Sequence, residues 1–377
     1  MKTSTIYIGI VFIFFLSTSI LSAQAKFSYR IINENVFAYN VISENSLVNP
    51  DNLLQLNELE IVNRFFPVGT FKKNKIRLQA EPKIFLNPLD ETLEFAINEL
   101  YLQYGISDKL YVTFGKKRIN WGTANVWNPS NPFLQKDPFR IDNRLEGIVL
   151  TDLEYIGANF TLNAIFSPAE RLNRSTFAFK VSSEIKSLSY SFSYAFLGDE
   201  KQQFGMDFSL GADNLTFYGE GVFRNFSNSR LIDSEGLPEI IGIQNGFKDM
   251  NAEFVVGTML NVLPRTILIT EYRYRSDFNT SESIENFKSF LPASLASYDP
   301  ISMGQHSFFG QISYMDAYSK YNLSTNIFYD LTTNQLLCSP GLVYNGDDFK
   351  LEINPFIYDN SLSIYDFQGR VIFSFFL

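Results

Sequence analysis

Strict alternation of polar and apolar residues is the feature of this sequence that most constrains its fold. Leu188–Phe196 reads LSYSFSYAF, with Ser on one face and larger apolar or aromatic residues on the other. Thr266–Arg275 likewise places Glu271, Arg273 and Arg275 on the face opposite its Leu and Tyr residues. Successive side chains of a β-strand point to opposite sides, whereas a helix would mix these charges with the aromatic residues. The chain is therefore predicted to be all-β.

The connections between these stretches indicate the architecture. About 18 alternating stretches follow residue 26, and about 16 strands remain the alternative if two stretches are divided wrongly. The long connections predicted at residues 122–144, 226–247 and 277–302 all follow odd-numbered strands, while most gaps after even-numbered strands are tight turns. A transmembrane barrel combines short turns on one side with long loops on the other. Residues 26–377 are thus predicted to form one antiparallel up-and-down transmembrane β-barrel, with the second strand at 52–64.

The first 25 residues read as a secretory signal peptide. Lys2 precedes a continuous apolar run, Ile6–Leu21, and Ala23-Gln24-Ala25 matches an A-x-A cleavage site, with cleavage after Ala23 as the alternative. No later apolar run approaches the roughly 20 residues that a transmembrane helix needs. The 38 Phe and 20 Tyr residues accompany a near-neutral mean hydropathy, which is typical of strands with one lipid-facing and one water-facing side. We expect the bacterial outer membrane, with both termini periplasmic.

The stretch from Leu110 to Glu154 contains the best candidate for a functional site. Arg118 and Asn120 fall on the polar face of its first strand, and a bulge is expected near Gly115. A loop that folds into a wide lumen narrows it, and its charges then select solutes. An extracellular loop with solvated charges is the alternative. The constriction is predicted to contain Arg118, Asn120, Arg140, Arg144 and Glu146.

The same stretch carries a family resemblance. GKKRINWGTANVWNPSNPF and DPFRIDNRLEG are similar to a segment of uncharacterised porin-like outer-membrane β-barrel proteins of Gram-negative bacteria. The resemblance implies a barrel and a transport role, and it assigns no substrate and no catalytic residue. The matching positions are Gly115, Ile119, Asn120, Trp121, Gly122, Trp127, Asn128, Pro129, Asp137, Pro138, Glu146 and Gly147.

Charged residues on the polar faces of other strands are predicted to point into the lumen. Their mixed signs indicate cross-strand ion pairs and modest selectivity, although any water-filled lumen tolerates charge. These residues are Lys75, Arg77, Glu81, Glu99, Glu271, Arg273 and Arg275.

The C-terminal stretch Gly369–Leu377 is amphipathic, with Phe373, Phe375 and Leu377 on one face. It resembles the C-terminal signal of outer-membrane barrels, which implies recognition by the barrel-assembly machinery. The other expected partners are outer-membrane lipid and small solutes, with a homo-oligomer left open. The net charge of −9 without a basic run argues against nucleic acid.

Catalysis and metal binding are not expected. The one His, His306, precedes Ser307 on a strand, and adjacent strand residues point to opposite faces. No His, Cys and carboxylate cluster has metal-ligand spacing, no cofactor motif is present, and the single Cys338 cannot form an internal disulfide. The function predicted is passive, porin-like diffusion of small hydrophilic solutes. The alternatives are a binding or assembly partner in an outer-membrane complex, a transporter of a hydrophobic substrate, and a surface enzyme.

Overall fold

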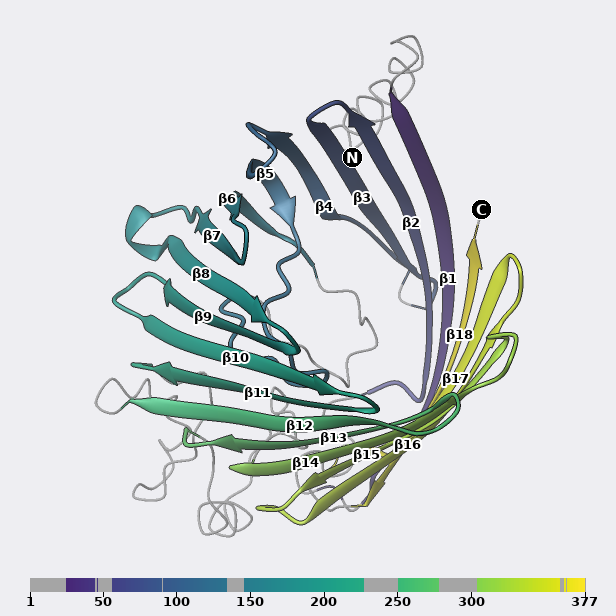
Figure 1. Cartoon of the computed structure of the whole chain (residues 1–377). Coiled ribbons are helices and arrows are strands. Elements are labelled where there is room, and N and C mark those ends of the chain that lie inside the picture. Colours follow the sequence, from purple (N-terminus) through teal and green to yellow (C-terminus); the bar gives the residue numbers. More distant parts are fainter. Residues whose placement is uncertain are drawn as a thin grey trace.

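A computed structural model describes residues 25–44, 46, 56–89, 91–133, 146–226, 250–277, 304–359, 363 and 365–376. Eighteen antiparallel strands form one sheet that closes on itself, because β1 pairs with both β2 and β18. Figure 1 shows the ring of strands. The strands are β1 (Lys26–Ile42), β2 (Leu59–Lys73), β3 (Ile76–Asn87), β4 (Thr92–Gly105), β5 (Leu110–Lys117), β6 (Ile148–Ile156), β7 (Phe160–Ser167), β8 (Thr176–Ile185), β9 (Leu188–Phe196), β10 (Gln202–Ala212), β11 (Leu215–Arg224), β12 (Asn251–Leu263), β13 (Thr266–Arg275), β14 (His306–Met315), β15 (Tyr321–Asp330), β16 (Gln335–Asn345), β17 (Phe349–Asp359) and β18 (Tyr365–Phe376), with one 3₁₀ turn, η3 (Leu172–Arg174), after β7.

The predicted all-β barrel and its count of 18 strands are confirmed. Every connection that follows an even-numbered strand is a short turn, and every long connection follows an odd-numbered strand. A further long connection, residues 43–58, follows β1, because β2 spans Leu59–Lys73 rather than 52–64. The outward Pro67 and Gly69 interrupt the apolar alternation of β2, which obscured its second half in the sequence. The predicted signal peptide lies outside the described residues.

The bulge expected near Gly115 is not in the β4–β5 ladder, which runs without a shift from Tyr111 to Lys116. Gly115 instead has a φ of 121° within a continuous ladder. The register shifts between β3 and β4 at Glu81/Pro82, opposite Asn98. This bulge turns both Asn98 and Glu99 inward, so that they and Glu81 are buried on the same side of the wall.

The two faces of the wall differ in chemistry. Exposed aromatic and aliphatic side chains cover the outside, including Phe114, Phe179 and Ile312. The inward positions of the same strands carry most of the charges, and many of these are buried against one another. No helix in the described part of the chain is long and apolar enough to cross a membrane.

Strands β5 and β6, of 8 and 9 residues, are shorter than the neighbouring β4, which has 14. Strand β5 ends at Lys117, and β6 begins at Ile148. The neighbouring β4 spans Thr92–Gly105, and its N-terminal part extends past these two residues. The chain therefore leaves the wall partway along β4. Figure 1 shows the backbone after β5 running inside the ring of strands.

Candidate pore constriction

Residues 118–133, here called the inserted segment, contact the inner faces of strands far from β5. Thr123 Oγ1 lies 3.3 Å from the carbonyl oxygen of Phe208 on β10, and Trp127 packs against Phe309 on β14. The described part of the long loop therefore crosses the barrel interior. The alternative of a wholly extracellular loop does not apply to these residues.

A local turn shapes the far end of the inserted segment. The N–H of Asn131 donates to the carbonyl of Asn128 at 3.1 Å, with Pro129 and Ser130 between them. Proline suits the second position of such a turn because its φ is fixed. The Asn131 side chain then donates to the carbonyl of Ile119 at 2.9 Å and accepts the N–H of Phe133 at 3.1 Å. The Asn- and Pro-rich sequence thus stabilises a compact, non-helical segment.

Glu271 on β13 is the first anchor of the inserted segment. Its carboxylate accepts the backbone N–H groups of Asn125 at 2.6 Å, Val126 at 3.2 Å and Trp127 at 3.3 Å. Tyr218 donates its hydroxyl to the same carboxylate at 2.9 Å and accepts the Asn125 side-chain amide at 2.8 Å. Glu271 is 1% exposed, so these donors compensate a charge that would otherwise be costly to bury.

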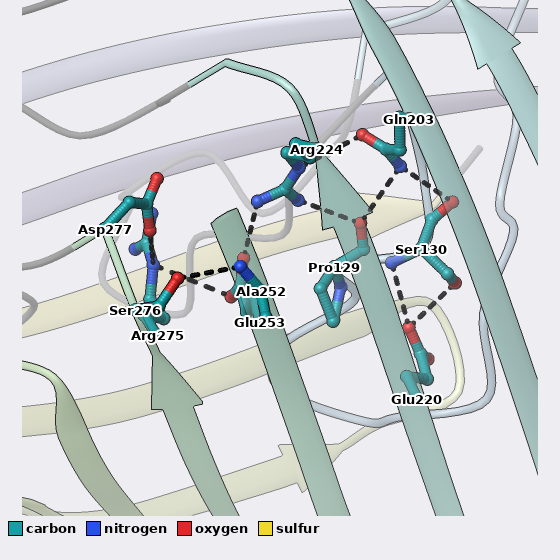
Figure 2. A network of polar contacts seen from close by, with 10 residues as sticks. All are labelled: Pro129, Ser130, Gln203, Glu220, Arg224, Ala252, Glu253, Arg275, Ser276 and Asp277. Atoms are coloured by element: carbon teal, nitrogen blue, oxygen red, sulfur yellow. Dashed lines mark hydrogen bonds and ion pairs between the residues drawn. The ribbon is translucent and has the colours of Figure 1, made fainter. Parts of the chain in front are cut away.

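Glu220 on β11 is the second anchor. It accepts the N–H of Ala124 at 2.5 Å, and both the N–H and hydroxyl of Ser130, at 3.3 and 2.9 Å. Gly122 lets the backbone come this close, because a Cβ there would lie 2.4 Å from Glu220 Oε1. The φ of Gly122, 98°, also suits glycine better than any L-residue. Figure 2 shows Ser130 above the Glu220 carboxylate.

Arg224 holds the turn from the other side. Its Nη2 donates to the Pro129 carbonyl at 3.0 Å, and Gln203 Nε2 donates to the same oxygen at 3.3 Å. The guanidinium also bonds Gln203 Oε1 and forms an ion pair with Glu253 at 2.9 Å. Figure 2 shows Arg224 and Gln203 converging on the Pro129 carbonyl. The turn is therefore fixed by groups from β10 and β11, and Glu253 on β12 holds the Arg224 guanidinium.

Trp127 attaches the segment to an apolar patch inside the barrel. Its ring meets Phe309 and Phe328 edge-on, at centroid distances of 6.3 and 6.4 Å. The Arg273 guanidinium lies 4.7 Å from the Trp127 ring centroid, a favourable cation–π distance. Leu337 and Phe356 extend the same buried cluster.

Arg118, at the start of the inserted segment, is held by acids of β3 and β4, the two strands before β5 in the wall. Its Nη2 lies 2.5 Å from Glu81 on β3 and 2.7 Å from Glu99 on β4. Glu99 also accepts the Arg118 backbone N–H at 3.0 Å. Next to this cluster, Lys117 forms a 2.9 Å ion pair with Asp152. The Arg118 side chain remains 31% exposed, so this end of the segment keeps contact with lumen water.

The structure brings together some of the residues predicted for the constriction. Arg118 joins the predicted lumen acids Glu81 and Glu99, and Asn120 is exposed between the buried Ile119 and Trp121. Glu146 is not in this cluster, because its carboxylate lies 3.6 Å from the outward Lys116. Arg140 and Arg144 lie outside the described residues.

The other charged residues predicted to face the lumen lie on different sides of the barrel. Arg77 lies 6.0 Å from the ring centroid of Tyr101, whereas Lys75 is in the exposed turn before β3. Glu271, Arg273 and Arg275 are buried on β13, across the lumen from Arg118.

The anchors Glu220 and Arg224 were not among the residues predicted from the sequence. Both lie in the stretch FYGEGVFR, where Tyr218, Glu220, Val222 and Arg224 alternate with outward Gly and Phe residues. The polar face of this strand was therefore visible in the sequence. Its role as a support for a distant loop was not, because Glu220 and Ser130 are separated by 90 positions.

His306 and Ser307 point to opposite sides of β14. His306 Nδ1 lies 2.6 Å from the Tyr272 hydroxyl on the outer surface, while Ser307 is buried inside and accepts from Arg273 at 3.3 Å. The two side chains therefore cannot act as a pair. Within the residues that the structure describes, no group of three or more His, Cys, Asp or Glu could hold a metal ion.

Comparison with known proteins supports the fold. No family model matches the chain, and no curated protein matches it by sequence. Among solved structures, it is similar to OccK2 (OpdF) of Pseudomonas aeruginosa in complex with glucuronate, with a TM-score of 0.62 and 11% identity over 93% of this chain and 98% of that chain. For OccK11 (OpdR) of P. aeruginosa the TM-score is 0.61 and the identity 11%, over 93% of this chain and 96% of that chain. For OprD of the same organism the TM-score is 0.55 and the identity 10%, over 93% of this chain and 95% of that chain. The predicted resemblance to porin-like outer-membrane barrels is thereby confirmed for the fold.

Proposed function

We propose that this chain is an outer-membrane channel of the porin type, through which small hydrophilic solutes diffuse passively. The observation that carries the proposal is the inserted segment, which is anchored across the barrel interior by Glu220 and Glu271. A barrel of about 18 strands is wide enough for water, and an inserted loop narrows it. The solved OccK2 structure holds glucuronate, a solute of this small and hydrophilic class.

The proposed constriction lies at the Arg118 end of the inserted segment. The far end is buried against β11–β16, so solutes would pass on the side of β3–β6. There the lumen presents Arg118 with Glu81 and Glu99, and Lys117 with Asp152. Charges of both signs at one place favour weak ion selectivity over a filter of one sign. Arg140 and Arg144 stay part of the proposal, together with Asn120.

Three further parts of the proposal follow from the barrel. The even strand number puts both termini on the side of the short turns, which would be periplasmic. The C-terminal strand β18, which closes the barrel against β1, would engage the barrel-assembly machinery. A catalytic role is not proposed, since His306 and Ser307 lie on opposite faces.

Single-channel recording tests the proposal directly. The mature protein, folded into a planar bilayer, is expected to give steady, stepwise conductance. A salt gradient should produce a small reversal potential, because the constriction carries charges of both signs. The heat-dependent shift of barrels on gels serves as the folding control. A barrel that is folded by this criterion and silent in the bilayer would contradict an open pore and favour a binding or assembly role.

A further inference from the structure

Two carboxylates of neighbouring strands lie side by side inside the barrel. Asp207 on β10 is directly opposite Glu220 on β11 in the ladder, and their side chains are buried, at 7% and 4% exposure. Residues at such positions have Cβ atoms about 4.5–5.5 Å apart, and like charges there are destabilising. The donors that Glu220 binds, Ala124 and Ser130, are neutral, and β12 presents the apolar Val255 on its other side. These contacts therefore leave the repulsion between the two acids uncompensated.

Lys180 on β8 supplies a compensating positive charge. Its Nζ donates to Asp207 Oδ2 at 3.1 Å, and Ser191 on β9 donates its hydroxyl to the same oxygen. The Lys180 side chain is only 11% exposed, so water screens this ion pair weakly. In the described part of the chain, Lys180 is the one cation that forms an ion pair with either Asp207 or Glu220.

The other titratable groups on the inner face of β11 are engaged elsewhere. Arg224, four residues along the strand from Glu220, pairs with Glu253 at 2.9 Å. Tyr218, two residues before Glu220, donates its hydroxyl to Glu271 at 2.9 Å. The charge balance of the acid pair therefore depends on the lysine of β8.

The same lysine also contacts the inserted segment directly. Lys180 Nζ lies 5.8 Å from the ring centroid of Trp121, within the range of a cation–π interaction. Trp121 belongs to a buried apolar cluster that includes Ala178 of β8 and Ala195 of β9. Lys180 thus links the segment to the acid pair of which one member, Glu220, is its anchor.

We propose that Lys180 is a positioning residue of the inserted segment, whose charge balances the Asp207–Glu220 pair and so keeps Glu220 in place to hold the segment. Without this charge, the two carboxylates repel each other in a buried site, and the bonds from Glu220 to the segment are lost as they separate. Lys180 is too buried to meet a passing ion, so it acts on the pore through the segment. The inference deepens the proposed function, and only its conductance readout rests on that function.

Tryptophan fluorescence makes the position of the segment measurable. Trp121 and Trp127 are the only tryptophans of the chain, and both lie in the inserted segment with 7% exposure. In Lys180→Met at neutral pH, the constant for quenching by acrylamide is expected to rise several-fold, and single-channel conductance should rise with it. Lys180→Arg, which keeps the charge, should match the wild type. So should the matched control Lys350→Met, which removes the lysine of another inward ion pair, with Glu352.

Removal of the second acid separates charge balance from packing. Lys180→Met/Asp207→Asn has no repelling pair, so its quenching should return to the wild-type value although the contact with Trp121 is still absent. Quenching of Lys180→Met should also fall in acidic buffer, where one of the two carboxylates is protonated. Wild-type quenching in Lys180→Met that is folded by gel shift, or a double variant quenched as strongly as the single one, would overturn the role of Lys180. The expected fluorescence changes in a barrel that never conducts would support that role and refute the channel.

Discussion

The two ends of the inserted segment are both held by carboxylates, but the carboxylates bond different groups. At the far end, Glu220 and Glu271 accept backbone N–H groups of a stretch, residues 122–133, that contains no charged side chain. At the near end, Glu81 and Glu99 bond the guanidinium of Arg118. The difference separates two roles of lumen charge: the far acids position the segment, while the near cluster remains partly in water and can act on solutes.

Burial explains why these roles differ. Glu271 and Glu220 are 1% and 4% exposed, and each is surrounded by donors that leave no room for a passing ion. The Arg118 side chain is 31% exposed. A charge contributes to ion selectivity only where ions can approach it. The number of carboxylate side chains in this lumen is therefore by itself a poor guide to its selectivity.

The largest effect is expected from Glu271→Ala. The change leaves three backbone N–H groups and the Tyr218 hydroxyl without their acceptor, at roughly 1–3 kcal/mol for each buried donor. The segment should detach, and single-channel conductance should rise and become noisy. Glu271→Gln, which retains an acceptor oxygen, should give a smaller rise.

The matched control for this prediction is Glu352→Ala. It removes a lumen carboxylate of β17 that pairs with Lys350 at 2.6 Å. Its conductance should resemble the wild type. Equal conductance for Glu271→Ala and wild type, in protein that is folded by gel shift, would refute the positioning role of Glu271.

An intermediate effect, on selectivity more than on conductance, is expected from Arg118→Ala. Bonds to charged groups contribute about 1.5–3 kcal/mol each when buried, and solvent around Arg118 reduces this, so the segment should stay in place. Without the Arg118 guanidinium, the negative charges of Glu81 and Glu99 should move the reversal potential in a salt gradient toward cation preference.

Combining Arg118→Ala with Arg144→Ala sharpens this prediction. An unchanged conductance and ion preference in the double variant would show that the constriction lies elsewhere. Arg118→Lys should preserve the sign of the reversal potential, since it keeps the positive charge.

The smallest effect is expected from Glu146→Gln. Its side chain is 54% exposed and its partner is the outward Lys116, and an exposed pair of this kind contributes about 0–1 kcal/mol. Conductance, reversal potential and stability to denaturant should match the wild type, as they should for Lys116→Gln. A reversal potential altered by Glu146→Gln alone would place this carboxylate beside the passage and extend the Arg118 cluster toward it.

The sequence by itself determined the barrel. Alternation is a local property, because each strand residue fixes which side its neighbours face, and the short and long connections could be sorted by strand parity. The same alternation put Glu81, Glu99, Glu271, Arg273 and Arg275 on the polar faces of their strands, and in the structure these side chains are buried.

Only the tertiary structure decided where the long loop goes and which charges remain available in the lumen. The contacts that draw the loop inward join positions 90 to 146 residues apart, and they use backbone N–H groups that every sequence contains. A buried carboxylate with free acceptor capacity attracts such donors wherever the barrel's curvature brings them within reach. No local pattern around Trp127 or Ser130 records that Glu271 and Glu220 will be there, because that proximity exists only once all 18 strands have closed.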